Sequence, residues 1–184
     1  MSWSSTYQAQ FSEQLVDQLL AIVQRDQRAA LDWVGGGLAD FQTYMTSPIL
    51  QPQYPCLLIA PVEDLFDPES QAGSLHYSST IEVEIGVAHQ DVRIVGRTLQ
   101  RYIRAVDAIV HTLADKPGAM ADLYTGLALT LPELAAGTMT TPLQTGSVKE
   151  IWIGSHRLSE IAALKQGGFW KAAKIEIRVD REEL

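Results

Sequence analysis

Cysteine is nearly absent from this chain, which has only Cys56 among its 184 residues. A single thiol rules out an intrachain disulfide and fits a protein that folds in a reducing cytoplasm. Its neighbours in Tyr54-Pro55-Cys56-Leu57-Leu58 are mostly apolar, so we expect the thiol to point into the core. The fold must therefore be stabilised by burial of apolar side chains without covalent cross-links.

Long apolar runs and an excess of positive charge are also missing. No segment approaches the roughly 18 apolar residues that cross a bilayer, and residues 1–5 do not resemble a signal peptide. The net charge is −8 and the pI is about 4.9. We therefore expect no membrane partner. We also expect no tight binding of nucleic acid, because binding of phosphates needs a basic face. An acidic protein can still let DNA slide past it.

Motifs for catalysis, cofactor binding and metal binding are missing as well. The four histidines lie in separate predicted elements and lack the spacing of a helical metal site: His76, His89, His111 and His156. Gly35-Gly36-Gly37 lacks the Lys-Ser/Thr of a phosphate-binding loop, and no Gly-x-Ser-x-Gly is present. We therefore predict no catalytic residue, no cofactor, no metal and no enzymatic activity, although a triad can also assemble from residues far apart in sequence.

An apolar content of 46% over this length predicts one folded domain that spans residues 1–184. Apolar residues at helical spacing predict a first helix over residues 11–31, preceded by a flexible arm at residues 1–10. Gly35-Gly36-Gly37 ends this helix. A second, short helical stretch is expected over residues 38–45.

The middle of the chain carries the clearest pattern. A short apolar run predicts a buried strand over residues 56–60, which Pro61 stops before a polar loop over residues 63–75. A two-residue alternation then predicts a strand over residues 77–88 with one buried face. A period of about 3.6 predicts a long helix over residues 92–114, packed over that strand.

The last third of the chain divides into an irregular part and a hairpin. Apolar residues interrupted by glycine and proline over residues 119–147 predict a long apolar loop or insertion. Its apolar side chains must be buried on its own domain or on another subunit. Residues 148–158 and 169–180 predict the arms of a hairpin. The fold class is therefore α+β, with a mainly antiparallel sheet of about four strands and helices packed on one face. Three residues of the apolar segment are candidate subunit contacts: Leu127, Leu131 and Met139.

Opposite charges gather on the outward faces of the predicted strand and helix. Four arginines on the helix form one stripe opposite its apolar stripe: Arg93, Arg97, Arg101 and Arg104. The strand presents Glu82 and Glu84 on its polar face. The stripe can be an ordinary solvated helix face, or it can be a docking face for carboxylates of a neighbouring copy.

The order of these elements resembles the tail terminator (tail completion) proteins of tailed bacteriophages. The likeness begins near Phe11 and includes the Tyr-Pro-Cys-Leu-Leu-Ile strand, the alternating strand Ile81–Val87 and the helix Val92–Leu113. It ends with the hairpin arm Lys174-Ile175-Glu176-Ile177-Arg178-Val179. It rests on element order and pattern, not on an invariant signature.

The resemblance implies a non-enzymatic virion protein, assembled in the host cytoplasm, that forms a hexameric ring at the head-proximal end of the tail. Such a ring stops polymerisation of the tail tube protein and joins the tail to the neck or connector protein, while DNA passes through its lumen without specific binding. An alternative is a head–tail adaptor, a stopper or another neck or tail protein. A third interpretation is a cytoplasmic small-molecule-binding or hydrolytic α/β domain. A deep pocket joining His111 or His156 to a carboxylate would support this third interpretation.

Overall fold

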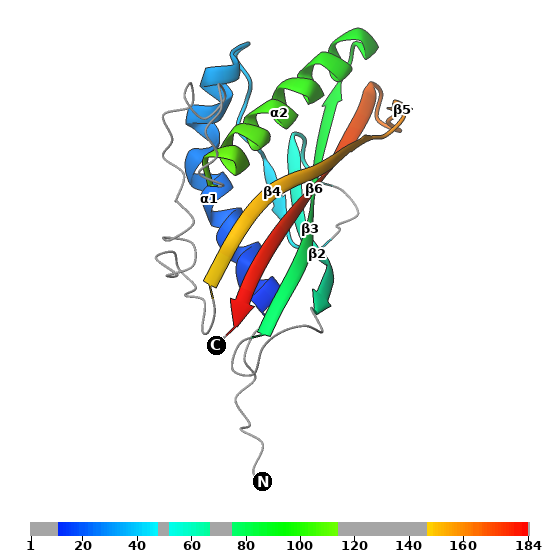
Figure 1. Cartoon of the computed structure of the whole chain (residues 1–184). Helices are drawn as coiled ribbons and strands as arrows, with labels where there is room; N and C mark the ends of the chain where they lie inside the picture. The colour runs from blue at the N-terminus through cyan, green and yellow to red at the C-terminus, as the bar shows by residue number, and fades with distance from the viewer. Residues whose placement is uncertain (1–10, 48–51, 67–74, 114–146, 184) are drawn as a thin grey trace.

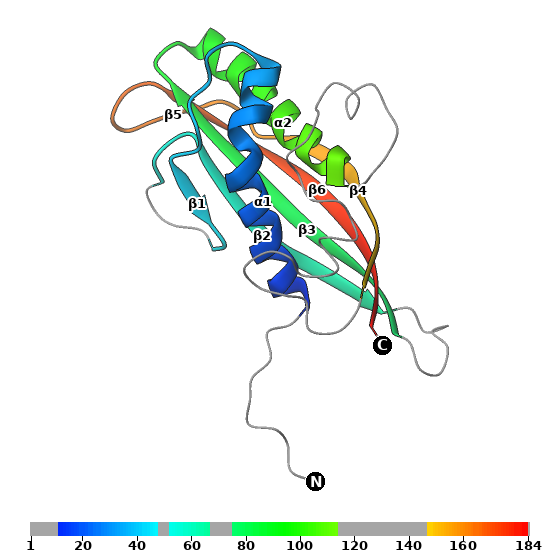
Figure 2. The ribbon, with the colours of Figure 1, turned by 90° about the vertical axis from the view of Figure 1, so that its left-hand side faces the viewer.

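The computed structural model describes residues 11–47, 52–66, 75–113 and 147–183. One sheet forms the first layer of the fold, and two helices cover one of its faces as a second layer (Figures 1 and 2). The elements in chain order are α1 (Phe11–Val34), β1 (Thr43–Met45), β2 (Cys56–Phe66), β3 (Leu75–His89), α2 (Val92–Leu113), β4 (Ser147–Leu158), β5 (Ala162–Ala163) and β6 (Phe169–Glu183). The expected flexible arm at residues 1–10 and nearly all of the apolar segment 119–147 lie outside the described residues.

The sheet has six strands and is mixed, which corrects the expectation of about four strands. Its order is β1-β2-β3-β6-β4, with β5 paired to β6. Every described pairing is antiparallel except that of β1 with β2, which is parallel. The four long strands were expected, whereas β1 and β5 contain only three and two residues. Strands this short carry no measurable alternation, so the sequence pattern could not reveal them.

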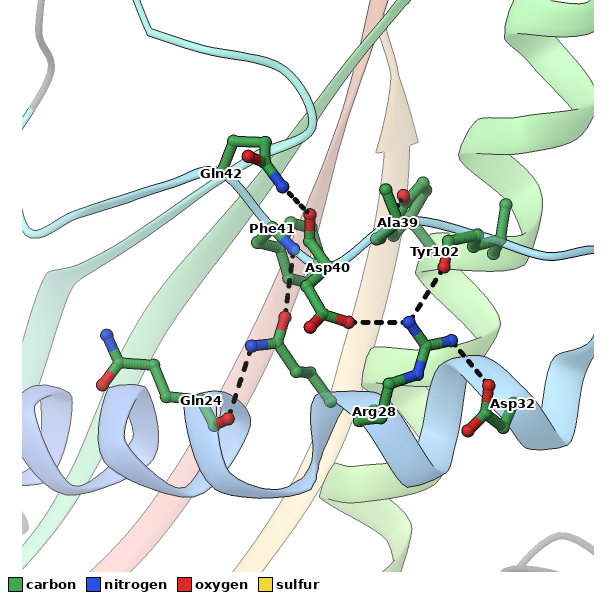
Figure 3. Close-up of polar contacts among 10 residues, drawn as sticks. Gln24, Arg28, Asp32, Ala39, Asp40, Phe41, Gln42 and Tyr102 are labelled. Atoms are coloured by element: carbon green, nitrogen blue, oxygen red, sulfur yellow. Dashed lines mark hydrogen bonds and ion pairs between the residues drawn. The ribbon is translucent and has the colours of Figure 1, made fainter.

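Strand β1 lies where a short helix was expected, and side chains from both helices explain the difference (Figure 3). The Arg28 guanidinium of α1 donates to the Leu38 carbonyl at 3.0 Å and to the Asp40 carboxylate at 2.8 Å. The Tyr102 hydroxyl of α2 donates to the Ala39 carbonyl at 2.6 Å. In a helix, the carbonyls of Leu38 and Ala39 would accept backbone N–H groups, but here they accept from side chains of α1 and α2 instead. The segment therefore lies against both helices in an extended form and joins the sheet as β1.

Strand β2 continues past Pro61 to Phe66, so the prediction that Pro61 stops it is wrong. Its register against β3 shifts between Pro61 and Glu63, which marks a bulge. Strand β1 pairs only with Cys56–Leu58, so β2 is the sheet edge where Pro61 lies. Proline is tolerated at edges and bulges because the missing N–H has no partner to lose there.

The strand and the helix in the middle of the chain confirm the change of hydrophobic period. On β3, Ile81, Val83 and Ile85 face the helices and are at most 1% exposed. Helix α2 begins where the Asp91 carboxylate accepts the Arg93 N–H at 2.8 Å, as expected for an N-cap. Its apolar stripe packs in the same core through Val95, Leu99 and Val106 among others. The core thus lies between the sheet and the two helices.

The terminal hairpin of β4 and β6 is also confirmed. Its turn contains Gly167 and Gly168 at φ values of +90° and +92°, which L side chains rarely adopt. Strand β4 is an edge of the sheet and contains two register shifts against β6. Within the described residues, no helix has the length and apolar content needed to span a bilayer.

Candidate functional site

The two charged surfaces predicted from the sequence lie on opposite sides of the fold. Glu82 and Glu84 point away from the helices, because the alternate residues of β3 face the core. Arg93, Arg97 and Arg101 are exposed on α2, in the layer on the other side of the sheet. The structure therefore does not bring the two surfaces together within one copy of the chain.

The carboxylates on the open face of the sheet already have counter-charges. Lys174 Nζ on β6 lies 2.6 Å from Glu82 Oε1 and 3.6 Å from Glu84 Oε2. The hydrogen bond to Glu82 raises the pKa of Lys174 above its usual value. Glu176, on the same face, lies 2.8 Å from Arg178 and 3.5 Å from Arg157. This sheet-face charge cluster thus holds three carboxylates and three cations.

The arginines of α2 have different surroundings. Arg93 pairs with Asp91 at 3.2 Å. The Arg104 guanidinium lies 5.4 Å from the ring centre of Trp33 on α1, in the range of a cation–π contact. Arg101 lies against Gly36, where a β-carbon would collide with its guanidinium. Within the part of the chain that the structure describes, neither Arg97 nor Arg101 forms an ion pair.

A pocket of about 350 Å³ lies beside this stripe, where α1, α2 and β4 meet. Its lining residues are Val34, Gln100, Arg101, Ile103, Arg104, Asp107 and His156. His156 Nε2 lies 2.9 Å from Asp107 Oδ1. Burial raises the pKa of Asp107, and the charge of His156 opposes this shift. The pocket therefore combines a buried acid, a histidine and two arginines.

A deep pocket that joins His111 or His156 to a carboxylate would support the third interpretation, and this open pocket joins His156 to Asp107. The two residues are 49 positions apart, and sequence reasoning did not connect them. One signal was available, because Asp107 interrupts the apolar run Ala105-Val106-Asp107-Ala108-Ile109. The seven lining residues contain no serine, threonine or cysteine, so they supply no nucleophile for a hydrolytic triad.

The remaining candidate residues are placed as follows. Leu127, Leu131 and Met139 lie outside the described residues. Cys56 is buried, and this burial raises the pKa of its thiol to about 11, so the thiol is protonated at neutral pH. Among the residues with described positions, no three or more histidine, cysteine, aspartate or glutamate side chains gather as a metal site would require.

Comparisons with known proteins do not identify a function for these residues. No protein-family model matches the chain, and no curated protein matches it. Among solved structures, a chain of the virion of a native gene transfer agent particle is similar over 91% of this chain and 97% of that chain. The identity is 13% and the TM-score is 0.45. At these values the likeness carries no argument about what this chain does.

Proposed function

We propose that this chain is a structural protein of a phage-like virion and that it acts there as a tail terminator. In this role it forms a hexameric ring at the head-proximal end of the tail tube, stops growth of the tube protein and joins the tail to the neck or connector protein. The order of elements, which resembles tail terminators, supports the proposal. Its position in the virion distinguishes it from the alternative of a head–tail adaptor or stopper.

The proposal of a ring is supported mainly by one observation: the two patches of opposite charge lie on opposite layers of the fold. A closed ring of identical copies needs two different and complementary patches on each copy. The arginines of α2 supply one patch, and Glu82 and Glu84 supply the other. Lys174 contacts only one oxygen of each of these carboxylates. The second oxygen of each carboxylate can therefore accept from an arginine of the next copy.

Apolar contacts and the lumen complete the proposal. Leu127, Leu131 and Met139 are proposed to add apolar area to the same ring contact, since charged pairs at a surface contribute little by themselves. DNA passes through the lumen without specific binding. The net charge of −8 suits this role, because a lumen that attracted phosphates would hold the DNA back.

The ring contact can be tested by exchanging charges between the two patches. One variant carries Arg97→Glu and Arg101→Glu. A second carries Glu82→Lys, Glu84→Lys and Lys174→Glu, which keeps opposite charges together within the sheet-face cluster. We expect each variant alone to lose the ring mass by light scattering at low salt, and an equimolar mixture to regain it, because every contact then joins opposite charges.

A matched control is Lys165→Glu, which reverses an exposed charge at the tip of the hairpin. This variant should assemble like the unmodified chain. The ring proposal is wrong if the unmodified chain stays monomeric at millimolar concentration and low salt. The assignment of the patches is wrong if the two charge-reversed variants keep the ring mass.

The terminator role is tested by removing the gene from the genome that encodes it and imaging the particles by electron microscopy. We expect tail tubes of uncontrolled length that are not joined to heads. The purified protein, added to such an extract, should restore capped tails. Tubes of normal length without heads would favour the adaptor or stopper alternative, and intact particles would contradict a virion role.

A further inference from the structure

The pocket between α1, α2 and β4 has an excess of positive charge. Two guanidinium groups, those of Arg101 and Arg104, line it together with the imidazole of His156. The only acid among the lining residues is Asp107, and His156 already occupies one of its oxygens at 2.9 Å. The lining therefore holds two permanent positive charges against one carboxylate that is already hydrogen-bonded.

Arg104 and Asp107 attract each other through their charges, but the other groups that hold the two arginines in place are uncharged. Arg104 packs over the face of Trp33, and Arg101 occupies the space that Gly36 leaves by lacking a side chain. Both contacts order the guanidinium groups and leave their N–H donors to a ligand. Such prior ordering lowers the entropy lost on binding.

We infer that this pocket binds a compact oxyanion, a carboxylate or a phosphate, through Arg101, Arg104 and the amide of Gln100. Arginine donates two parallel N–H bonds to either kind of oxyanion. The volume of about 350 Å³ is near the lower end of the range for small-molecule sites, and fits a ligand of the size of citrate or a sugar phosphate. Val34 and Ile103 supply an apolar wall beside the charged groups.

The inference is tested by isothermal titration calorimetry of the full chain at low salt and neutral pH, with inorganic phosphate and, separately, with citrate as the ligand. We expect saturable binding at one site per chain. Arg104→Gln and Arg101→Gln should each weaken binding about tenfold or more, since a charged hydrogen-bond donor is lost in each. Circular dichroism of each variant reports whether the fold is retained.

Arg97→Gln is the matched control, because Arg97 belongs to the same helix and the same stripe but does not line the pocket. Its effect should be about twofold or less, because Arg97 is one turn from Arg101 and acts on a ligand only through charge, without a hydrogen bond in the pocket. The inference is overturned if no saturable binding occurs up to tens of millimolar, or if Arg97→Gln weakens binding as much as Arg104→Gln.

The oxyanion can be free or can belong to a second copy of the chain, and light scattering separates the two sources. If phosphate lowers the mass of an assembled ring, the pocket holds a carboxylate of the neighbouring copy, an outcome that rests on the proposed function. If phosphate binds and leaves the mass unchanged, the ligand is a free anion. The titration needs no assembly, so failure of the ring and failure of the pocket are distinguishable.

Discussion

The open face of the sheet and the exposed side of α2 are both rich in charge, but only the first is electrically balanced by its own residues. On the sheet, the carboxylates of Glu82 and Glu84 share Lys174, and Glu176 lies between Arg178 and Arg157. On the helix, Arg97 and Arg101 have no ion pair with any residue that the structure describes.

This difference indicates which of the two surfaces would gain more electrostatic stabilisation from binding a charged partner. Binding an anion at Arg97 or Arg101 adds a counter-charge where the described residues supply no ion pair, and it breaks none of the described ion pairs. Binding a cation on the sheet side competes with Lys174 and the neighbouring arginines. The helix side is therefore where we place the proposed oxyanion site, whereas in the proposed ring an arginine of the next copy would have to share Glu82 and Glu84 with Lys174.

The largest expected effect separates the two faces of β3. Ile81 is fully buried against the helices, whereas its neighbour Glu82 is on the open face. Ile81→Ala should lower the free energy of unfolding by about 3 kcal/mol, because it leaves a cavity in the core. Glu82→Ala should lower it by less than about 1 kcal/mol. Urea unfolding measures both, and equal losses would contradict the view that the buried face of β3 contributes more to stability than its open face.

The next effect concerns the buried acid of α2. Burial raises the pKa of Asp107, so the folded chain binds its proton more tightly than the unfolded chain. The stability that this gives is present below the pKa of the unfolded chain and is lost as pH rises through the folded pKa. Asp107→Asn should therefore become more stable relative to the unmodified chain as pH rises from 3 to 7, because asparagine does not titrate. Thermal unfolding across this range measures the gain, and parallel curves would contradict the prediction.

A smaller effect is expected where the sheet-face charge cluster loses its shared cation. Lys174→Met leaves Glu82 and Glu84 as like charges on one strand face. We expect a loss of about 0.5–1 kcal/mol, since the pairs are partly exposed. The loss should shrink in 1 M salt, where the screening length falls to about 3 Å. A loss that is independent of salt would mean that Lys174 acts through packing alone.

The smallest effect is expected on the helix side, and its sign is opposite. Arg97→Met removes a charge that has like charges one turn away at Arg93 and Arg101. Relief of this repulsion should leave the unfolding free energy unchanged or raise it by about 0.2–0.5 kcal/mol at low salt. A clear destabilisation would show that Arg97 has a stabilising partner in its own chain, and the contrast between the two surfaces would then fail.

The helices and strands with one buried face were predictable, because their buried apolar residues recur at a regular spacing along the sequence. The alternation in Ile81-Glu82-Val83-Glu84-Ile85 and the spacing of Val95, Leu99 and Val106 each match the face that the structure buries. Local signals failed where distant residues decided the outcome. Arg28 and Tyr102 prevent a helix at residues 38–45, and an open edge allows β2 to continue past Pro61.

The sequence by itself determined the number of thiols, the net charge, the long elements and the spacing of the arginines on one helix face. Only the tertiary structure decided which charges are balanced, because ion pairing depends on distances of a few ångströms between strands and helices far apart in the chain. Lys174 reaches Glu82 across 92 positions, and His156 reaches Asp107 across 49. The arginines of α2 were candidates from the sequence alone, but only the structure showed that Arg101 and Arg104 line a pocket.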